Sequence, residues 1–357
     1  MSGMTSDPNS LHPCASRPSV VWARIRRGCL LCWALAAWSL NQGAGAASAP
    51  GAATVQPGLR DAAFGPLLTP AALLAQLPRV RVVDLREADG ADASYAAGHI
   101  PGAVSAPYAA WRGPADNPGE LLPVVRYVGL VRSLGVDAQT PVVLVADGSG
   151  PSDFGAPARV YWTLKWLGLQ RLAILNGGMV AWTREGLPVT RQAVRARPSR
   201  FVPRFDAAIL ATRTAVFRDV QDPRAALLLD ARPRAFYLGR AKAPAAARPG
   251  TLPGAVDFDN ARWFAGESGA LPDAAVLQRV ARGLPPMDPK RPVVSFCNTG
   301  HWAATNWFVL SEVLHRPDVK LYPGSMVDWS RADEPMAHVP SRFEQLWTQL
   351  KQAWQGL

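Results

Sequence analysis

The sequence predicts an α/β protein with two copies of one domain, each built on a parallel sheet that is covered on both faces. Similar motifs occur twice in the same order, about 150 residues apart. Within each copy, short continuous runs of valine and leucine alternate with segments whose apolar residues have helical spacing. The 357 residues, 48% hydrophobic and 18% charged, are enough for two domains of average size.

The N-terminal segment has the pattern of a secretory signal. Arg24, Arg26 and Arg27 precede the apolar run "GCLLCWALAAWSL", and small residues suited to signal cleavage follow at 44–46. The apolar run is shorter than the roughly 20 residues of a membrane-spanning helix, which favours cleavage over a membrane anchor. Residues 1–46 are therefore expected to be a signal peptide, and the mature protein is expected to be periplasmic or secreted and free of the membrane.

The charge distribution narrows the class of partner. The formal net charge is +11, and the basic residues are scattered along the chain. No segment combines basic and aromatic residues in the manner of a nucleic-acid-binding module, so no nucleic-acid partner is expected. The positive excess suits a small anionic substrate or an acidic partner, and the alternative is an ordinary solvated surface.

The duplication is clearest in the strands and turns. In both copies an apolar strand ends in Asp-x-Arg and leads to Pro-Gly-Ala-Val. Asp84 and Arg86 carry this motif in the first copy, and Asp230 and Arg232 carry it in the second. Two further pairs of similar segments are 140–150 with 291–300, and 172–189 with 319–336. A similar order at a nearly constant offset indicates a duplicated domain.

These pairs set the domain boundaries. The first domain is expected at 60–190 and the second at 208–340. The segment 191–207 contains proline and arginine with little periodicity and is interpreted as a linker. Residues 341–357, which contain "FEQLWTQLKQAWQ", are expected to form a final amphipathic helix.

One cysteine remains in the predicted mature protein. Cys14, Cys29 and Cys32 lie in the expected signal peptide, which leaves Cys297 alone. A lone cysteine cannot form an internal disulfide, a CxxC redox pair or a zinc site. In an oxidising compartment such a thiol is expected to be either buried or used.

The position of Cys297 points to a chemical role. It stands where the apolar run "PVVSF" ends and just before the helix-like run 303–314, the junction at which parallel α/β sheets bind ligands. Backbone N–H groups of 298–302 can surround its sulfur, with Gly300 giving conformational freedom, and the following helix dipole adds positive potential. Both effects favour the nucleophilic thiolate, and His301 can add a proton or a hydrogen bond.

A simpler interpretation stays open for these residues. Cys297 could be a buried cysteine that acts as a small apolar side chain, and His301 could be a loop histidine without a role. The polar loop, the start of a helix and the single remaining cysteine together favour the functional interpretation.

The motifs together resemble the tandem-domain rhodaneses, sulfurtransferases of the thiosulfate or 3-mercaptopyruvate type. The shared features are Asp-x-Arg after the first strand, "GHIPGA" with "GTLPGA", the loop "CNTGHW", and "LNGGMVAW" with "LYPGSMVDW", over roughly residues 60–340. The resemblance implies two rhodanese-like domains, each a five-stranded parallel sheet flanked by helices. It also implies that only the second is catalytic, since Asp147 is expected at the cysteine's place in the first and cannot take up sulfur.

The resemblance also implies a mechanism. Cys297 would attack the outer sulfur of a small anionic donor such as thiosulfate and become a persulfide, without metal or organic cofactor. A thiol, cyanide or possible protein acceptor would then take the sulfur. The residues expected to bind the persulfide or the substrate are Asn298, Thr299, Gly300, His301, Trp302, Asp230, Arg232 and Arg240.

The loop departs from the family pattern in two ways. Thiosulfate-preferring members resemble C-R-K-G-V-T and mercaptopyruvate-preferring members C-G-S-G-V-T, whereas "CNTGHW" matches neither and leaves the donor open. It lacks a basic pair for a dianion, so His301 and nearby arginines are expected to hold it. Phe236 also replaces the arginine found before Tyr-Leu-Gly in vertebrate-type enzymes, and Arg234 or Arg240 is expected to compensate.

Other classes of function are distinguished by the same loop. A cysteine phosphatase follows C-x5-R, but the position six residues after Cys297 is Ala303. A non-catalytic persulfide carrier or partner-binding module stays open. Trp302 suggests an apolar lip for a bulky acceptor, or else packing between the domains.

Overall fold

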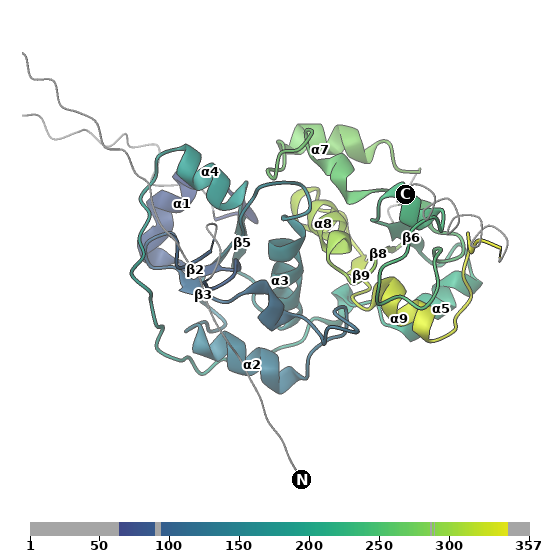
Figure 1. Ribbon diagram of the computed structural model, residues 1–357, viewed down its shortest axis with the longest axis horizontal. Coiled ribbons are helices and arrows are strands. Elements are labelled where there is room, and N and C mark those ends of the chain that lie inside the picture. The colour runs from purple at the N-terminus through teal and green to yellow at the C-terminus, as the bar shows by residue number, and fades with distance from the viewer. Residues whose placement is uncertain (1–63, 90–93, 286–287, 289, 342–357) are drawn as a thin grey trace, which may run out of the picture. The chain divides into compact units, whose positions relative to one another are not determined.

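A computed structural model describes residues 64–89, 94–285, 288 and 290–341 (Figure 1). The described residues belong to one compact unit, Gln56–Leu357. The predicted signal peptide at 1–46 lies outside the described residues, and so does the predicted C-terminal helix apart from residue 341. Among the described residues, none of the helices has the length and apolar character needed to cross a bilayer.

The first sheet has five parallel strands in the order β1-β5-β4-β2-β3, which confirms the prediction for the first copy. Its three inner strands, β5, β4 and β2, consist almost wholly of buried residues, because helices cover both faces of the sheet. The strands are β1 Leu67–Leu68, β2 Arg81–Asp84, β3 Val104–Ser105, β4 Val142–Val145 and β5 Leu172–Leu175.

The second sheet has four parallel strands, in the order β7-β6-β8-β9, so the prediction of five was wrong for this copy. Leu210 occupies the place of the missing strand and forms a single parallel bridge to Leu321. The pairing extends no further because a 3-10 helix ends at Ile209 and Thr212 already caps the next helix. The strands are β6 Leu227–Asp230, β7 Val256–Asp257, β8 Val293–Phe296 and β9 Val319–Leu321.

Helices connect the strands, and several begin at a side-chain cap. Thr69, Thr212 and Asp273 each accept the N–H group of the third helical residue. The α-helices are α1 Pro70–Gln76, α2 Val124–Ser133, α3 Gly155–Trp166, α4 Gly178–Arg184, α5 Arg213–Gln221, α6 Arg234–Tyr237, α7 Ala274–Ala281, α8 Trp302–Phe308 and α9 Ser325–Arg331. The short elements are η2 Leu77–Arg79, η3 Tyr108–Trp111, η4 Ala207–Ile209, η5 Asn260–Trp263 and the π-helical turn η6 Val309–Val313.

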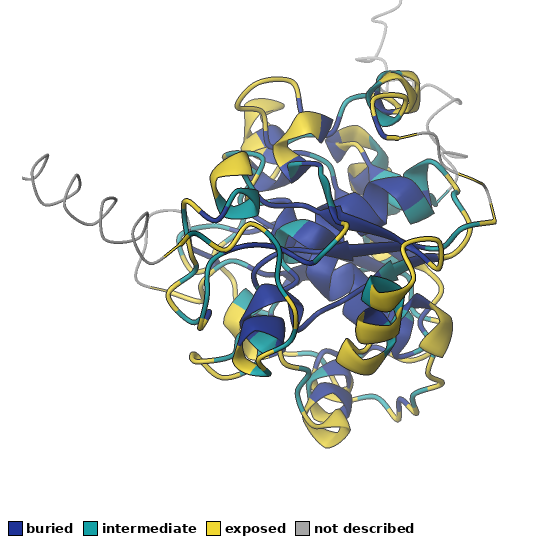
Figure 2. Cartoon of the chain, turned by 90° about the vertical axis from the view of Figure 1, so that its right-hand side faces the viewer, coloured by how far each residue is buried: buried dark blue, intermediate teal, exposed yellow. Residues whose placement is uncertain are grey.

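The two domains share one hydrophobic core, because α3 of the first packs against α8 of the second. Phe308 meets Tyr161 and Phe154 edge-on, with ring centroids 5.1 and 5.5 Å apart. Next to these rings the buried carboxylate of Glu312 accepts hydrogen bonds from the Tyr161 hydroxyl at 2.8 Å and from Lys165 Nζ at 2.7 Å. Figure 2 shows buried strands between helices whose outer faces are exposed.

The predicted linker, 191–207, carries no helix or strand before η4 begins at Ala207. Its backbone follows the first domain, since Ser199 N–H donates to Arg132 O and Arg204 N–H donates to Leu167 O, both at 2.9 Å. These bonds hold the segment on the surface of the domain it leaves.

Candidate active site

Cys297 lies directly after strand β8 and five residues before the start of α8, at the carboxyl end of the second sheet. Its backbone is fixed by the start of α9: its N–H donates to Ser325 Oγ at 3.0 Å, and its carbonyl accepts from Met326 N at 3.0 Å. Ser325 itself has a left-handed φ of 52°, an uncommon conformation for a residue with a side chain. The backbone of Cys297 is therefore held in place by the start of α9, the helix that follows strand β9.

The loop after Cys297 is shaped by Gly300. This residue has a φ of +72°, and a Cβ there would lie 2.7 Å from Pro323 O, so only glycine fits. The backbone N–H groups of residues 298–301 donate to no acceptor among the described residues. They are consequently free to stabilise an anion, although the predicted hydrogen bonds to the cysteine sulfur are not formed in this state.

Cys297 forms part of the wall of a cavity of about 250 Å³. Only 1% of the residue is exposed, and it also belongs to the shared apolar core. The cavity lining comes from both domains and consists of Tyr108, Arg112, Cys297, Asn298, Thr299, His301 and Trp302. The thiol thus borders both the apolar core and a small cavity whose lining includes Arg112 and His301.

The first domain contacts the cysteine loop directly. Tyr108, at the start of η3, places its hydroxyl 3.0 Å from His301 Nδ1, and Arg112 Nη2 donates to Thr299 O at 2.8 Å. Trp302 Nε1 donates to Ser152 Oγ at 3.0 Å. The loop is therefore held between the two domains.

His301 is neutral at physiological pH. Burial, with the nearby Arg112 charge adding to it, lowers the pKa of His301 to about 4. Its Nε2 lies 2.9 Å from the carbonyl oxygen of Ser152, which can only accept, so Nε2 carries the proton. Nδ1 then accepts from the Tyr108 hydroxyl. His301 supplies a fixed orientation to the loop rather than the positive charge that the sequence suggested.

Asp230 and Arg232 form a buried pair beneath the loop. Arg232 Nε and Nη2 donate to the two carboxylate oxygens of Asp230 at 2.8 and 2.6 Å, and Nη2 also donates to Gly250 O. The pair reaches the loop through Arg232 Nη1, which donates to Asn298 Oδ1 at 3.3 Å. Neither residue lines the cavity.

The structure brings together five of the predicted residues: Cys297, Asn298, Thr299, His301 and Trp302 line one cavity, with Gly300 shaping the turn. Arg240 is exposed and does not line this cavity. Phe236, which replaces the expected arginine, packs edge-on against Trp302 with ring centroids 6.0 Å apart.

Sequence reasoning missed the contribution of the first domain. Tyr108 and Arg112 follow the first Pro-Gly-Ala-Val motif by a few residues, and nothing in their own segment indicates chemistry. Their role depends on how the two domains dock. The only signal in the sequence is that a polar pair occupies a turn at the carboxyl end of the first sheet.

The assignment of Asp147 to the cysteine's place was wrong. In the strand registers Val145 pairs with Asp84 as Phe296 pairs with Asp230, so Ala146 corresponds to Cys297. The helix contacts agree, because Met179 N–H donates to Ala146 O as Met326 N–H does to Cys297 O. The first domain still lacks a nucleophile at this position, and Asp147 is the counterpart of Asn298.

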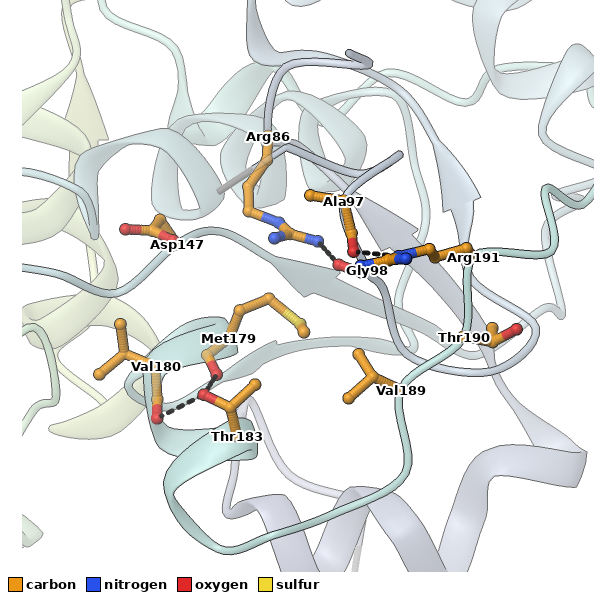
Figure 3. A pocket seen from close by; sticks show the side chains of 10 residues that line it. All are labelled: Arg86, Ala97, Gly98, Asp147, Met179, Val180, Thr183, Val189, Thr190 and Arg191. Atoms are coloured by element: carbon orange, nitrogen blue, oxygen red, sulfur yellow. Dashed lines mark hydrogen bonds between the residues drawn. The ribbon is translucent and has the colours of Figure 1, made fainter. Parts of the chain in front are cut away.

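Asp147 lines a separate cavity of about 580 Å³ in the first domain (Figure 3). Arg86, Gly98 and Arg191 also line it, and Asp147 lies across it from Arg191. Arg86 donates to Asp84 Oδ2 at 2.6 Å and to Gly98 O at 2.7 Å, the arrangement that Arg232 has in the second domain. Within the described residues, no group of three or more His, Cys, Asp or Glu side chains could hold a metal ion.

The fold and the site define a class: a duplicated parallel α/β domain in which one copy presents a cysteine loop and the other completes the cavity around it. The family model for the rhodanese-like domain matches residues 69–185 and 214–332. The chain therefore belongs to the rhodanese family, with two rhodanese-like domains.

Named relatives cover most of the described chain. The thiosulfate sulfurtransferase of Rattus norvegicus is 30% identical over 246 residues, which are 68% of this chain and 80% of the relative. Sulfur carrier protein TtuD of Thermus thermophilus is 29% identical over 264 residues, 71% of this chain and 88% of the relative. The crystal structure of SseA from Escherichia coli, a 3-mercaptopyruvate sulfotransferase, matches with a TM-score of 0.63 and 26% identity, covering 73% of this chain and 98% of SseA.

Proposed function

We propose that this protein is a sulfurtransferase that carries the transferred sulfur on Cys297. The observation that supports this most strongly is a cysteine at a cavity wall, followed by a loop whose N–H groups at 298–301 have no acceptor in the described part of the chain. A negatively charged sulfur in that cavity would gain the hydrogen bonds that an oxyanion hole gives to oxygen. The printed names of the relatives agree with this activity.

The first half-reaction loads the cysteine. The Cys297 thiolate forms a bond to the outer sulfur of a donor such as thiosulfate, and the S–S bond of the donor breaks. Its electron pair leaves with sulfite, so the charge of minus three on the reactants is kept as a persulfide anion and a sulfite dianion. The N–H groups of residues 298–301, which donate to no acceptor in the described part of the chain, could then stabilise the charge of the persulfide.

The second half-reaction unloads it. A thiophilic acceptor such as cyanide, or a thiolate, bonds to the outer sulfur of the persulfide, and the Cys297 thiolate leaves. The small cavity, about 250 Å³, suits a donor and acceptor of few atoms. Thiosulfate and 3-mercaptopyruvate are the donors to test first, since they appear in the names of the relatives.

A persulfide carrier is the second candidate, and Trp302 is the observation that favours it. Its indole lies at the cavity wall, against Phe236 on one side and Ser152 on the other, and gives the site an aromatic edge that a protein acceptor could contact. One relative is named a sulfur carrier protein. In that case transfer to cyanide would be slow, and transfer to a protein thiol would be fast.

The test compares the wild-type chain with Cys297→Ser. Thiocyanate formation from thiosulfate and cyanide should occur with the wild type and be lost in the variant, because oxygen cannot take the place of the nucleophilic sulfur. Intact-mass spectrometry after donor treatment should show one added sulfur atom on the wild type alone. Loading without turnover would support the carrier, and no loading by any donor would exclude both proposals.

We also propose that residues 1–46 direct export and are removed. The basic residues, apolar run and small residues of that segment support it. Expression of the full chain in a bacterium should yield a protein in the periplasmic fraction whose first residue follows Ala46. An unprocessed protein in the cytoplasmic fraction would contradict the proposal.

A further inference from the structure

Two arginines of the first domain have buried N–H groups without an acceptor near Cys297. Arg112 has one such nitrogen, Nη1, and Arg159 has two, Nε and Nη2, among the described residues. A buried cation that has no carboxylate partner is costly, by several kcal/mol in typical proteins. Such a group gains charge-assisted hydrogen bonds when an anion binds next to it.

Arg112 is placed to contact a molecule in the cavity. Its Nη2 donates to Thr299 O, and its Cζ lies 5.2 Å from the centre of the Tyr108 ring, so the guanidinium is held in one orientation. The side chain lines the cavity together with Cys297. The remaining N–H groups of Arg112 form a fork of the kind that binds oxoanions through two parallel hydrogen bonds.

Arg159 lies deeper, in helix α3, with 1% of the residue exposed. Its Nη1 donates to Thr163 Oγ1 at 2.8 Å, and its Cζ lies 4.8 Å from the Trp162 ring centre. Burial lowers the pKa of Arg159, and its charge interacts with Arg112, Tyr108 and Cys297. Arginine keeps its charge in proteins, so α3 adds positive potential at the thiol.

The residues that the sequence suggested as cations for this site do not offer a free positive charge to the cavity. Arg232 is neutralised by Asp230, and Arg240 is exposed without lining the cavity. His301 is neutral, because burial, with the Arg112 charge adding to it, lowers its pKa to about 4. The loop itself, Cys297 to Trp302, has no lysine or arginine.

We propose that Arg112, reinforced by Arg159, is the anion subsite of the sulfur donor, so that the first domain supplies donor recognition for the cysteine of the second. The inference rests on the proposed function. The ligand class is a small donor with an oxyanion group next to its transferable sulfur. As the thiolate of Cys297 bonds to the outer sulfur, the leaving group takes the electron pair while its oxygens stay on Arg112.

The experiment measures single-turnover loading of Cys297 by intact-mass spectrometry in the full chain. Arg112→Gln should lower the rate with subsaturating thiosulfate by about tenfold, the effect of losing one charge-assisted contact. Arg112→Lys should restore part of that rate, since it keeps the charge but not the fork. Arg126→Gln, an exposed arginine on α2, is the matched control and should load as the wild type does.

A second donor separates anion recognition from general damage to the site. An alkyl hydropersulfide without a carboxylate or sulfonate loads the same cysteine but offers no oxyanion, so Arg112→Gln should change its rate by less than about twofold. Arg159→Met should slow loading from both donors, and Arg159→Lys should restore it, because Arg159 acts on the sulfur through its charge.

The outcomes distinguish the two proposals. Equal thiosulfate loading in the wild type and Arg112→Gln, over the whole concentration range, overturns the anion subsite while leaving sulfur transfer intact. An equal loss with both donors in Arg112→Gln also overturns it, because the residue would then support the loop alone. A wild-type chain that loads from neither donor contradicts sulfur transfer at Cys297 instead.

Discussion

At the scale of single residues, the site depends on side chains whose roles are set by the domain opposite. His301 belongs to the cysteine loop, but its ring is oriented by Tyr108 and by the carbonyl of Ser152 in the first domain. The second domain positions the sulfur of Cys297. The first domain contributes the hydrogen-bonding groups that orient His301, and the charge of Arg112 beside the loop. The proposed chemistry at Cys297 therefore depends on residues nearly 200 positions away in the sequence.

The depressed pKa of His301 predicts how stability responds to acid. The pKa is about 4 in the folded protein and 6.5 in the reference state, so between these values the unfolded chain binds a proton that the folded chain does not. The free energy of unfolding should therefore be undiminished by this group above about pH 6.5 and fall as the pH drops toward about 4.

Urea unfolding at several pH values checks this, with His301→Gln as the reference. Glutamine can keep a donor and an acceptor but does not titrate, so the wild type should lose more stability than the variant between about pH 7 and pH 5. Other titrating groups are shared by both proteins and cancel in the difference. Parallel pH curves for the two proteins would show that His301 is protonated as easily in the fold as in the unfolded chain.

Residue-level prediction grouped residues that line one cavity where they are adjacent in the sequence, and it was wrong where the assignment depends on strand register. Cys297 and its loop were identified from a strand, a polar turn and a helix that are adjacent in the sequence. Asp147 was matched to Cys297 because both follow an apolar run, whereas strand pairing shows Ala146 there. Arg112 could not be found, because its contact to Thr299 exists only once the domains have docked.

At the scale of elements, the loop between β8 and α8 places the Cys297 thiol at the cavity wall. Gly300 allows the turn to pass close to Pro323, and Ser325 at the start of α9 holds the Cys297 backbone. Strand β8 ends at Phe296 and α8 begins at Trp302, so the loop between them has only five residues. The turn is thus the element on which the proposed reactivity of Cys297 depends.

Gly300→Ala should abolish most activity, and Gly254→Ala should not. Both glycines have a φ of +72°, so an alanine costs about 1 kcal/mol in backbone strain at either place. A Cβ at Gly300 would also meet Pro323 O at 2.7 Å, whereas a Cβ at Gly254 would meet nothing within 4 Å. The sulfur-loading rate and the urea midpoint of each variant measure the two effects separately. Similar loading rates in both variants would show that the shape of the loop does not control the thiol.

Element-level prediction gave the correct number of strands for the first sheet and one strand too many for the second. The motifs that identify strands are the apolar runs, and both copies have these at the centre of the sheet. The edge strand is set by only two residues in the first copy, Leu67 and Leu68, and by the single bridge of Leu210 in the second. So short a pairing leaves almost no periodicity in the sequence.

At the scale of the whole described chain, the two domains contribute different residues to one cavity. The second keeps the cysteine, while the first has alanine in its place and contributes Tyr108 and Arg112 to the cavity wall. This division requires the domains to stay docked. The shared core around Phe308 and the buried carboxylate of Glu312 provide that docking.

The two domains should therefore unfold together, and Glu312 should matter to both. Glu312→Ala leaves the buried Tyr161 hydroxyl and Lys165 without their acceptor, which should lower the free energy of unfolding by about 2 kcal/mol. Arg224→Ala, which removes the exposed pair with Asp222, should change it by less than about 0.5 kcal/mol. Tryptophan fluorescence and circular dichroism should report one coincident urea transition for each protein. Two separate transitions in the wild type would mean that the domains are independent, and the cavity at their junction could then open without unfolding either one.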